Sequence, residues 1–192
     1  MLNGFTNVTI TKDLTKDIIK SLEYLAKKTV CIGIPDSTMH PDSKISNAQL
    51  LYIHTNGIRD KDMISEMQHN QDNKDGPYSE AYKLYVHEHG SPLWQSPPRP
   101  VLEPAIDNSK EQVAELMKDT VNVALKGDNI SPALNQVGMQ GQNIVRKWFT
   151  DPNNKWAPNA PSTIKAKGSE NPLIDKGSLR KSITYIIKDG DV

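Results

Sequence analysis

The sequence has little of several features that would point directly to a class of protein. It contains one cysteine, two phenylalanines, and 23 basic and 23 acidic residues among its 192 residues. The single cysteine, Cys31, excludes an intramolecular disulfide, and its apolar surroundings indicate a small buried side chain in a reducing compartment. A formal net charge of zero excludes the general basic excess typical of nucleic-acid-binding proteins, so partners must be recognised by local surfaces.

Long hydrophobic runs are also missing. The longest aliphatic or aromatic run in the N-terminal part, at residues 50–53, is far too short to span a bilayer. The opening residues, MLNGFTNVTITKDLTKD, lack the basic and apolar regions of a secretory signal. We therefore expect a soluble protein that is made in a cytoplasm and has no membrane partner.

Familiar enzyme motifs are absent as well. The chain has no Gly-x-Ser-x-Gly elbow, no Gly-x-x-x-x-Gly-Lys phosphate loop and no Cys-x-x-Cys pair. These absences favour a protein that is not an enzyme, with no catalytic residues, no cofactor and no metal.

The patterns that are present predict one α+β domain over 1–192. Apolar residues at helical spacing predict three amphipathic helices at 13–28, 104–126 and 132–149. Apolar and alternating runs predict strands at Val30–Ile34 and Ser182–Ile187, in a small, mainly antiparallel sheet. The segment 150–173 is rich in Pro, Asn, Ser and Lys, so we expect an extended surface loop there.

Two stretches read almost alike, LYIHTNG at 51–57 and LYVHEHG at 84–90. Both are predicted helix ends: Ser46 and Gln49 form a capping box before the first, Ser79 caps the second, and Gly57 and Gly90 end them. A repeat protein would show its pattern throughout each unit, and only seven positions recur. We interpret 55–87 as a helical insertion whose loop, 60–76, is the least packed part of the middle of the chain.

Three histidines, His54, His87 and His89, offer an alternative reading as a metal-dependent enzyme, with Glu88 as a further ligand or a base. His87 and His89 are two residues apart, so on a helix they point about 200° away from each other rather than to one metal. Histidines at helix ends are also stabilised simply by the helix dipole. The structural role is therefore favoured over the metal site.

The C-terminal third is mildly basic. Residues 146–188 contain nine lysines and arginines against Asp151, Glu170 and Asp175. Together with Trp148 and Trp156, these cations could contact phosphates and bases, which gives a second alternative, a nucleic-acid-binding module.

Two further features concern packing. The glycines of GMQGQ at 138–142 predict the close approach of a neighbouring helix. Trp94, Trp148 and Trp156 are candidate interface anchors, because aromatic side chains dominate protein interfaces and two of the three lie in or beside proline-rich loops.

Five stretches in order carry a resemblance to a known family: NAQLLYIH, EHGSP, PPRPVLEPAI at 97–106, WAPNAPSTIKAKG at 156–168 and PLIDKGSLRKSITYII at 172–187. The chain resembles the tail-completion or minor-tail-component family of tailed bacteriophages, which includes Mu-like virion morphogenesis proteins and lambda's minor tail protein Z. It departs from the family pattern at Val101, Asn159 and Lys176, where Phe, Leu and Thr are usual.

This resemblance implies a structural virion protein that acts at the head-proximal end of the tail, in tail completion or head–tail joining. It implies a homo-oligomeric ring, commonly six-fold, that contacts the tail terminator or tail tube protein, neck or connector proteins, and DNA in the channel. The protein would be made in the cytoplasm of the bacterial host and end in the virion. The interface candidates are Trp94, Pro98, Arg99, Pro100, Trp148 and Trp156, and the candidates for contact with channel DNA or an acidic ring are Lys165, Lys167, Arg180 and Lys181.

Overall fold

The computed structural model describes residues 13–35, 39–41, 45–57 and 97–190. These residues form an α+β fold, as the sequence predicted. The elements are α1 (Thr15–Ala26), β1 (Lys28–Gly33), α2 (Asn47–Asn56), α5 (Leu102–Asn108), α6 (Lys110–Leu125), α7 (Ser131–Trp148), the 3-10 helix η1 (Pro152–Asn154), α8 (Pro161–Lys167), α9 (Ser178–Ser182) and β2 (Thr184–Asp189).

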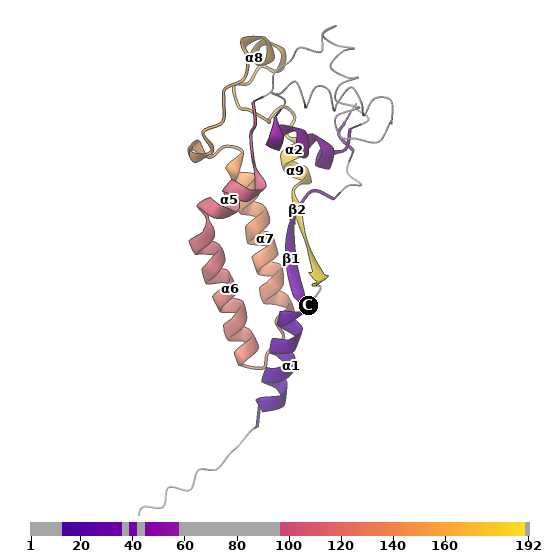
Figure 1. The fold of residues 1–192 in the computed structure, drawn as a ribbon, viewed down its shortest axis with the longest axis vertical. Helices are drawn as coiled ribbons and strands as arrows, with labels where there is room; N and C mark the ends of the chain where they lie inside the picture. The colour runs from indigo at the N-terminus through magenta and orange to yellow at the C-terminus, as the bar shows by residue number, and fades with distance from the viewer. Residues whose placement is uncertain (1–12, 36–38, 42–44, 58–96, 191–192) are drawn as a thin grey trace, which may run out of the picture.

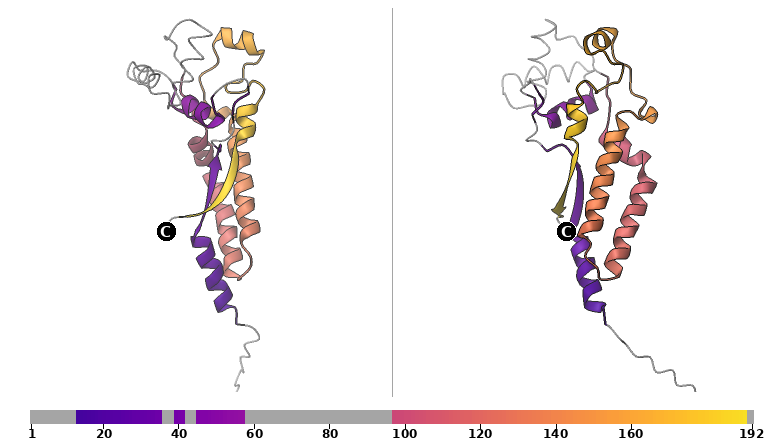
Figure 2. Two further views of the ribbon diagram at one scale, coloured as in Figure 1. Left: turned by 90° about the vertical axis from the view of Figure 1, so that its right-hand side faces the viewer. Right: turned by 180° about the vertical axis from the view of Figure 1, so that it is seen from behind.

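The described part of the chain is elongated (Figure 1). The antiparallel helices α6 and α7 run beside the sheet, and α7 contacts both β1 and β2. Helix α1 packs against α6 and extends one end of the molecule, whereas α2, α8 and α9 gather at the other end (Figures 1 and 2). The long helices therefore separate a narrow helical end from a broader end made of short elements and loops.

The sheet joins segments from the two halves of the sequence. Strands β1 and β2 are antiparallel, with Lys28 opposite Asp189 and Gly33 opposite Thr184. The predicted antiparallel pairing is confirmed, although Ser182, expected in the second strand, instead ends α9. The reason is that Gly177, with φ of 78°, opens a short helix just before the strand. Ile183, which follows α9, is fully buried and faces the core.

The helix predicted over 104–126 is two helices. The backbone at Ser109, with φ of −116° and ψ of 17°, ends α5 and begins α6. Helix α5 turns away from the axis of α6 and packs against α7 (Figure 1). This bend, which the continuous apolar pattern did not reveal, lets Ala105 enter the core with no exposed surface.

Most of the core lies at the broader end. Its buried members come from α2, from α5 and the residue before it, from the second half of α7 and the residue after it, and from α9 and the residue after it: Leu51, Val101, Ala105, Ile144, Val145, Trp148, Phe149, Leu179 and Ile183. A smaller cluster of Ala124, Ile130 and Leu134 holds the turn between α6 and α7. Cys31 is half-buried in β1 and pairs with the exposed Ile186, so it is less enclosed than expected.

The two glycines of α7 contact the sheet, not another helix. A Cβ atom at Gly138 would lie 2.1 Å from Cδ2 of Tyr185 on β2. A Cβ atom at Gly141 would lie 2.2 Å from Cδ1 of Ile32 on β1. The prediction of close approach is right and its predicted partner is wrong, because the strands, which lack the bulk of a helix, come directly over this face of α7.

The segment 150–173 is not a continuous loop. It contains η1 and the two-turn helix α8, which begins at Pro161 and ends at Gly168 in the left-handed conformation, with φ of 67°. Proline is common at the first position of a helix, and glycine in the left-handed conformation commonly ends one. None of its residues is buried, so this part of the prediction agrees with the structure.

Much of the expected insertion cannot be compared with the structure. Thr55 and Asn56 belong to the last turn of α2, and residues 58–87, including the 60–76 loop, lie outside the described residues. Within the described ranges, no helix has the length and apolar character needed to cross a membrane.

Candidate functional site

The proline-rich strap at 97–100 lies at the broader end, between α2 and α5. The side chain of Arg99 is 7% exposed and donates from Nε and Nη2 to the carbonyl of Ala157, at 3.1 and 3.0 Å, and from Nη2 to that of Pro158, at 3.1 Å. Its backbone N–H donates to the carbonyl of His54 at 2.7 Å. Arg99 thus ties the end of α2 and the loop before α8 to the strap.

The carbonyl of Pro100 is the second junction of the strap. It accepts a hydrogen bond from the indole Nε1 of Trp148 at 3.3 Å and another from the indole Nε1 of Trp156 at 3.1 Å. Trp156 also meets Phe149 edge to face, with ring centroids 5.8 Å apart. Three of the predicted interface residues therefore contact one another inside a single chain.

These contacts place two of the predicted interface residues within their own chain. Trp148 is 6% exposed and belongs to the main core, and Arg99 is buried among carbonyls of its own chain. The reason is that α7 points Trp148 along the same apolar face as Ile144 and Val145. Pro98 and Trp156 are half-buried, Pro100 is exposed, and Trp94 lies outside the described residues.

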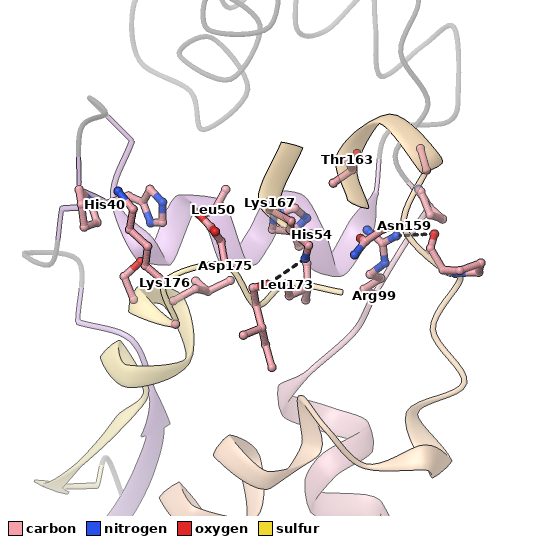
Figure 3. A pocket seen from close by; sticks show the side chains of 18 of the residues that line it. His40, Leu50, His54, Arg99, Asn159, Thr163, Lys167, Leu173, Asp175 and Lys176 are labelled. Carbon is pink, nitrogen blue, oxygen red and sulfur yellow. Dashed lines mark hydrogen bonds between the residues drawn. The ribbon is translucent and has the colours of Figure 1, made fainter. Parts of the chain in front are cut away.

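A groove of about 1060 Å³ opens beside the strap (Figure 3). It is bounded by α2, the strap, α8 and the turn that leads into α9. Leu50, Leu173, Ile174 and Leu179 supply its apolar lining, and His40, His54, Arg99, Lys167, Asp175 and Lys176 supply its titratable groups. Leu173 adopts φ of 57°, which is unusual for a bulky residue and marks a backbone held in place by its surroundings.

His54 is the most perturbed titratable group described at this groove. Burial lowers the pKa of His54 to about 4, with further lowering by the positive charges of Arg99, His40 and Lys167. The imidazole is therefore neutral at neutral pH. Its Nδ1 atom is buried and has no hydrogen-bond partner in the described part of the chain.

The metal reading of the histidines is not supported by a ligand cluster. Within the described ranges, no group of three or more His, Cys, Asp or Glu side chains could hold a metal ion. His87 and His89 lie outside those ranges, so the proposed three-histidine set is not tested.

The four predicted cationic contacts lie on α8 and α9. Lys165 and Lys181 are exposed, and Arg180 is half-buried. Lys167 is half-buried and donates from Nζ to the carbonyls of Asn171 and Ile174, the latter at 2.8 Å. Burial lowers the pKa of Lys167, and the neighbouring Asp175 opposes this.

Arg180 and Lys181 line a smaller pocket of about 260 Å³ with Arg146. Arg146 is occupied in the same way as Arg99: Nε and Nη2 donate to the carbonyl of Ile183 at 3.1 and 2.7 Å, and Nη2 donates to that of Lys181 at 2.9 Å. Ile174 and Gly177 line both pockets, so the cations of α8 and α9 lie on either side of one turn.

The sequence did not predict the groove or the place of four titratable residues in it, His40, His54, Asp175 and Lys176. The sequence presents His54 only as a helix-end residue or a metal ligand. These residues come from segments far apart in the chain, and no local spacing connects them. The one signal in the sequence was the departure at Lys176, where a cation replaces the usual Thr.

Comparison with known proteins adds no assignment, since no protein-family model, curated protein or solved structure matches this chain.

Proposed function

We propose that this chain is a structural virion protein of a tailed phage, acting in tail completion or head–tail joining at the head-proximal end of the tail. The observation that carries the proposal is that three stretches with the family resemblance meet in space. Arg99 of the first binds carbonyls of the second, Trp156 of the second binds Pro100 of the first, and Leu179 of the third is buried beside them. The motifs therefore build one end of the molecule.

The contacts among these motifs are architectural. Arg99 directs three hydrogen bonds to backbone carbonyls, and Trp156 donates to a backbone carbonyl. Arg146 and Trp148 of α7, outside these stretches, bind backbone carbonyls in the same way. Hydrogen bonds of this kind hold loops at defined positions. A rigid end made of short elements suits a protein whose role is to join neighbours.

Exposed apolar side chains on α6 support association between copies. Met117, Val121 and Leu125 are 42%, 39% and 51% exposed. They are four residues apart, so they form one stripe along the helix. We propose that this α6 stripe packs against a second copy in a homo-oligomeric ring, for which the resemblance suggests six subunits.

The partners follow from the same proposal. The ring would contact the tail terminator or tail tube protein on one side and neck or connector proteins on the other. The exposed cations Lys165 and Lys181 would face channel DNA or an acidic ring. The protein would be made in the host bacterial cytoplasm and incorporated into the virion.

Electron microscopy of particles made without this protein tests the role. We expect separate heads and tails, and we expect the purified chain added in trans to restore joining. Fully joined, infectious particles in the absence of the protein would contradict the proposal.

The ring is tested by native mass spectrometry of the purified chain. The expected result is a species several times the 21.4 kDa chain mass. Val121→Lys, in the α6 stripe, should shift the mass toward the monomer, whereas Asn122→Lys, on the neighbouring exposed position, should leave it unchanged. If the two variants gave species of the same mass, the α6 stripe would be excluded as the interface.

A further inference from the structure

The groove beside the strap has an excess of positive charge on its walls. Arg99 and Lys167 contribute basic side chains, Lys176 adds an exposed one at the rim, and Asp175 is the one acid among the described lining residues. The charges of Arg99 and Lys167 both act on His54, so they share one electrostatic environment. Figure 3 shows these side chains around a common space.

The groove also contains an unsatisfied polar atom. Nδ1 of His54 is shielded from solvent and has no hydrogen-bond partner among the residues that the structure describes. Buried polar groups in folded proteins are nearly always paired, and an exception calls for an explanation. A ligand in the groove would supply one, either by pairing directly with the imidazole or through a bound water.

The shape and lining of the groove limit the class of ligand. Arg99 lines the groove, but it is 7% exposed and its Nε and Nη2 already donate to carbonyls of its own chain. A ligand therefore has only the remaining nitrogen, Nη1, to bind, which favours a slender group entering the groove over the broad backbone of a nucleic-acid duplex. Leu50, Leu173 and Leu179 lie beside the cations, which favours a ligand with both acidic and apolar groups. An extended peptide with carboxylates between apolar side chains has both properties.

We propose that the groove binds an acidic peptide segment of a neighbouring protein, with a carboxylate held between Arg99 and Lys167 and apolar side chains against Leu50 and Leu173. Arginine and lysine form strong, short hydrogen bonds with carboxylates, and these are strengthened where water is partly excluded. The identification of the neighbour as a virion protein rests on the proposed function, but binding itself does not.

Binding is measured with the full chain and three fluorescein-labelled probes: a Glu-Glu-Leu repeat peptide, its Gln-Gln-Leu counterpart and a DNA duplex. Fluorescence anisotropy should show affinity for the acidic peptide about tenfold higher than for the amide peptide, as expected for one charge-assisted hydrogen bond. Equal affinity for the two peptides would overturn the proposal. Binding of the duplex in preference to the acidic peptide would overturn it in favour of nucleic acid.

Matched lysine variants locate the binding. Lys176→Gln, at the rim of the groove, should weaken binding of the acidic peptide several-fold, whereas Lys165→Gln, exposed on α8 outside the groove, should leave it unchanged. Both lysines are exposed, so neither substitution opens a cavity in the core. Equal effects of both would show that the peptide binds to general surface charge, and the groove would be excluded.

A resonance assignment separates this inference from the proposed function. In 15N-labelled protein, the acidic peptide should shift the imidazole resonances of His54 and the Nε–H resonance of Arg99, while the amide peptide leaves both in place. Peptide binding with normal particle assembly in the absence of the protein would retain the groove and reject the virion role. Failed assembly without any shift at His54 or Arg99 would retain the role and reject the groove.

Discussion

Trp148 and Trp156 donate their indole N–H groups to the same acceptor, the carbonyl oxygen of Pro100. One residue comes from the last turn of α7 and the other from the loop that follows η1. A carbonyl oxygen has two lone pairs and can accept both bonds. The strap is therefore fixed at one atom by two side chains that are eight residues apart in the sequence.

The shared acceptor predicts coupling between the two tryptophans. Trp156→Phe keeps an aromatic ring against Phe149 and removes one donor, so we expect a loss of about 1 kcal/mol in the free energy of unfolding. Trp148→Phe also leaves a gap in the core, so we expect about 2–3 kcal/mol. The double variant should lose more than the sum, because the acceptor then has neither indole. Urea unfolding measures all three, and additivity within about 0.3 kcal/mol would contradict the coupling.

The Arg99 contacts predict that charge alone does not suffice at this position. Arg99→Lys keeps the positive charge but cannot reproduce donation from two nitrogens to Ala157 and Pro158, so we expect a loss of about 2–3 kcal/mol. Arg180→Lys is the control, since Arg180 is half-buried and forms no side-chain hydrogen bond within the described ranges. Thermal or urea unfolding checks both. A loss at Arg99 no larger than that at Arg180 would show that the carbonyl contacts contribute little.

Gly138 predicts a steric requirement in α7. In Gly138→Ala the added Cβ would collide with the ring of Tyr185, which is also held by a hydrogen bond from its hydroxyl to Asn135 at 3.1 Å. We expect a destabilisation of about 1–3 kcal/mol, typical of overpacking. Gly33→Ala is the control, since no atom of the described residues other than those of its chain neighbours lies within 4 Å of its added Cβ. Circular dichroism during urea titration compares the two, and equal stability would mean that α7 and β2 separate readily.

His54 predicts a specific loss of stability in acid. Its pKa is about 4 in the folded protein against 6.5 for the free side chain, so the unfolded chain takes up the proton first as the pH falls. The stability that the neutral His54 contributes is fully present above about pH 6.5 and is lost as the pH falls from there to about 4. The loss in the free energy of unfolding reaches about 2 kcal/mol at about pH 5. A His54→Leu variant is the control, because it keeps every carboxylate of the original chain and lacks only the imidazole. The difference in stability between about pH 7 and pH 5 should therefore be larger in the original chain, and equal differences would show that His54 titrates normally.

Features determined by neighbouring residues were predictable. The capping box at the start of α2 is present, with Gln49 N–H donating to Ser46 Oγ at 3.1 Å and Ser46 N–H to Gln49 Oε1 at 3.0 Å. Gly57 ends the helix with φ of 70°. Three or four residues contain all the information needed for such a motif, so its position follows from sequence.

Features that join distant segments were predictable only in part. The apolar face of α7 places Trp148 in the core, whereas its place among the interface candidates, which came from residue type, did not indicate how deeply it is buried. The carbonyl partners of Arg99 are 58 and 59 residues away, and carbonyls leave no signature in a sequence. The groove is lined by five separate segments, so it could be found only in three dimensions.

The pairing of β1 with β2 also has a consequence for the order of events during synthesis. Lys28 and Asp189, which pair in the sheet, are 161 residues apart in the chain. At synthesis rates of roughly 5–20 residues per second, β1 leaves the ribosome about 10–30 s before its partner. Helices α6 and α7 can associate during that interval, but the face of α7 that bears Gly138 has no Tyr185 to cover it. The nascent chain therefore holds an open apolar surface until its last strand emerges, and this is the period in which chaperones would have their longest access to it.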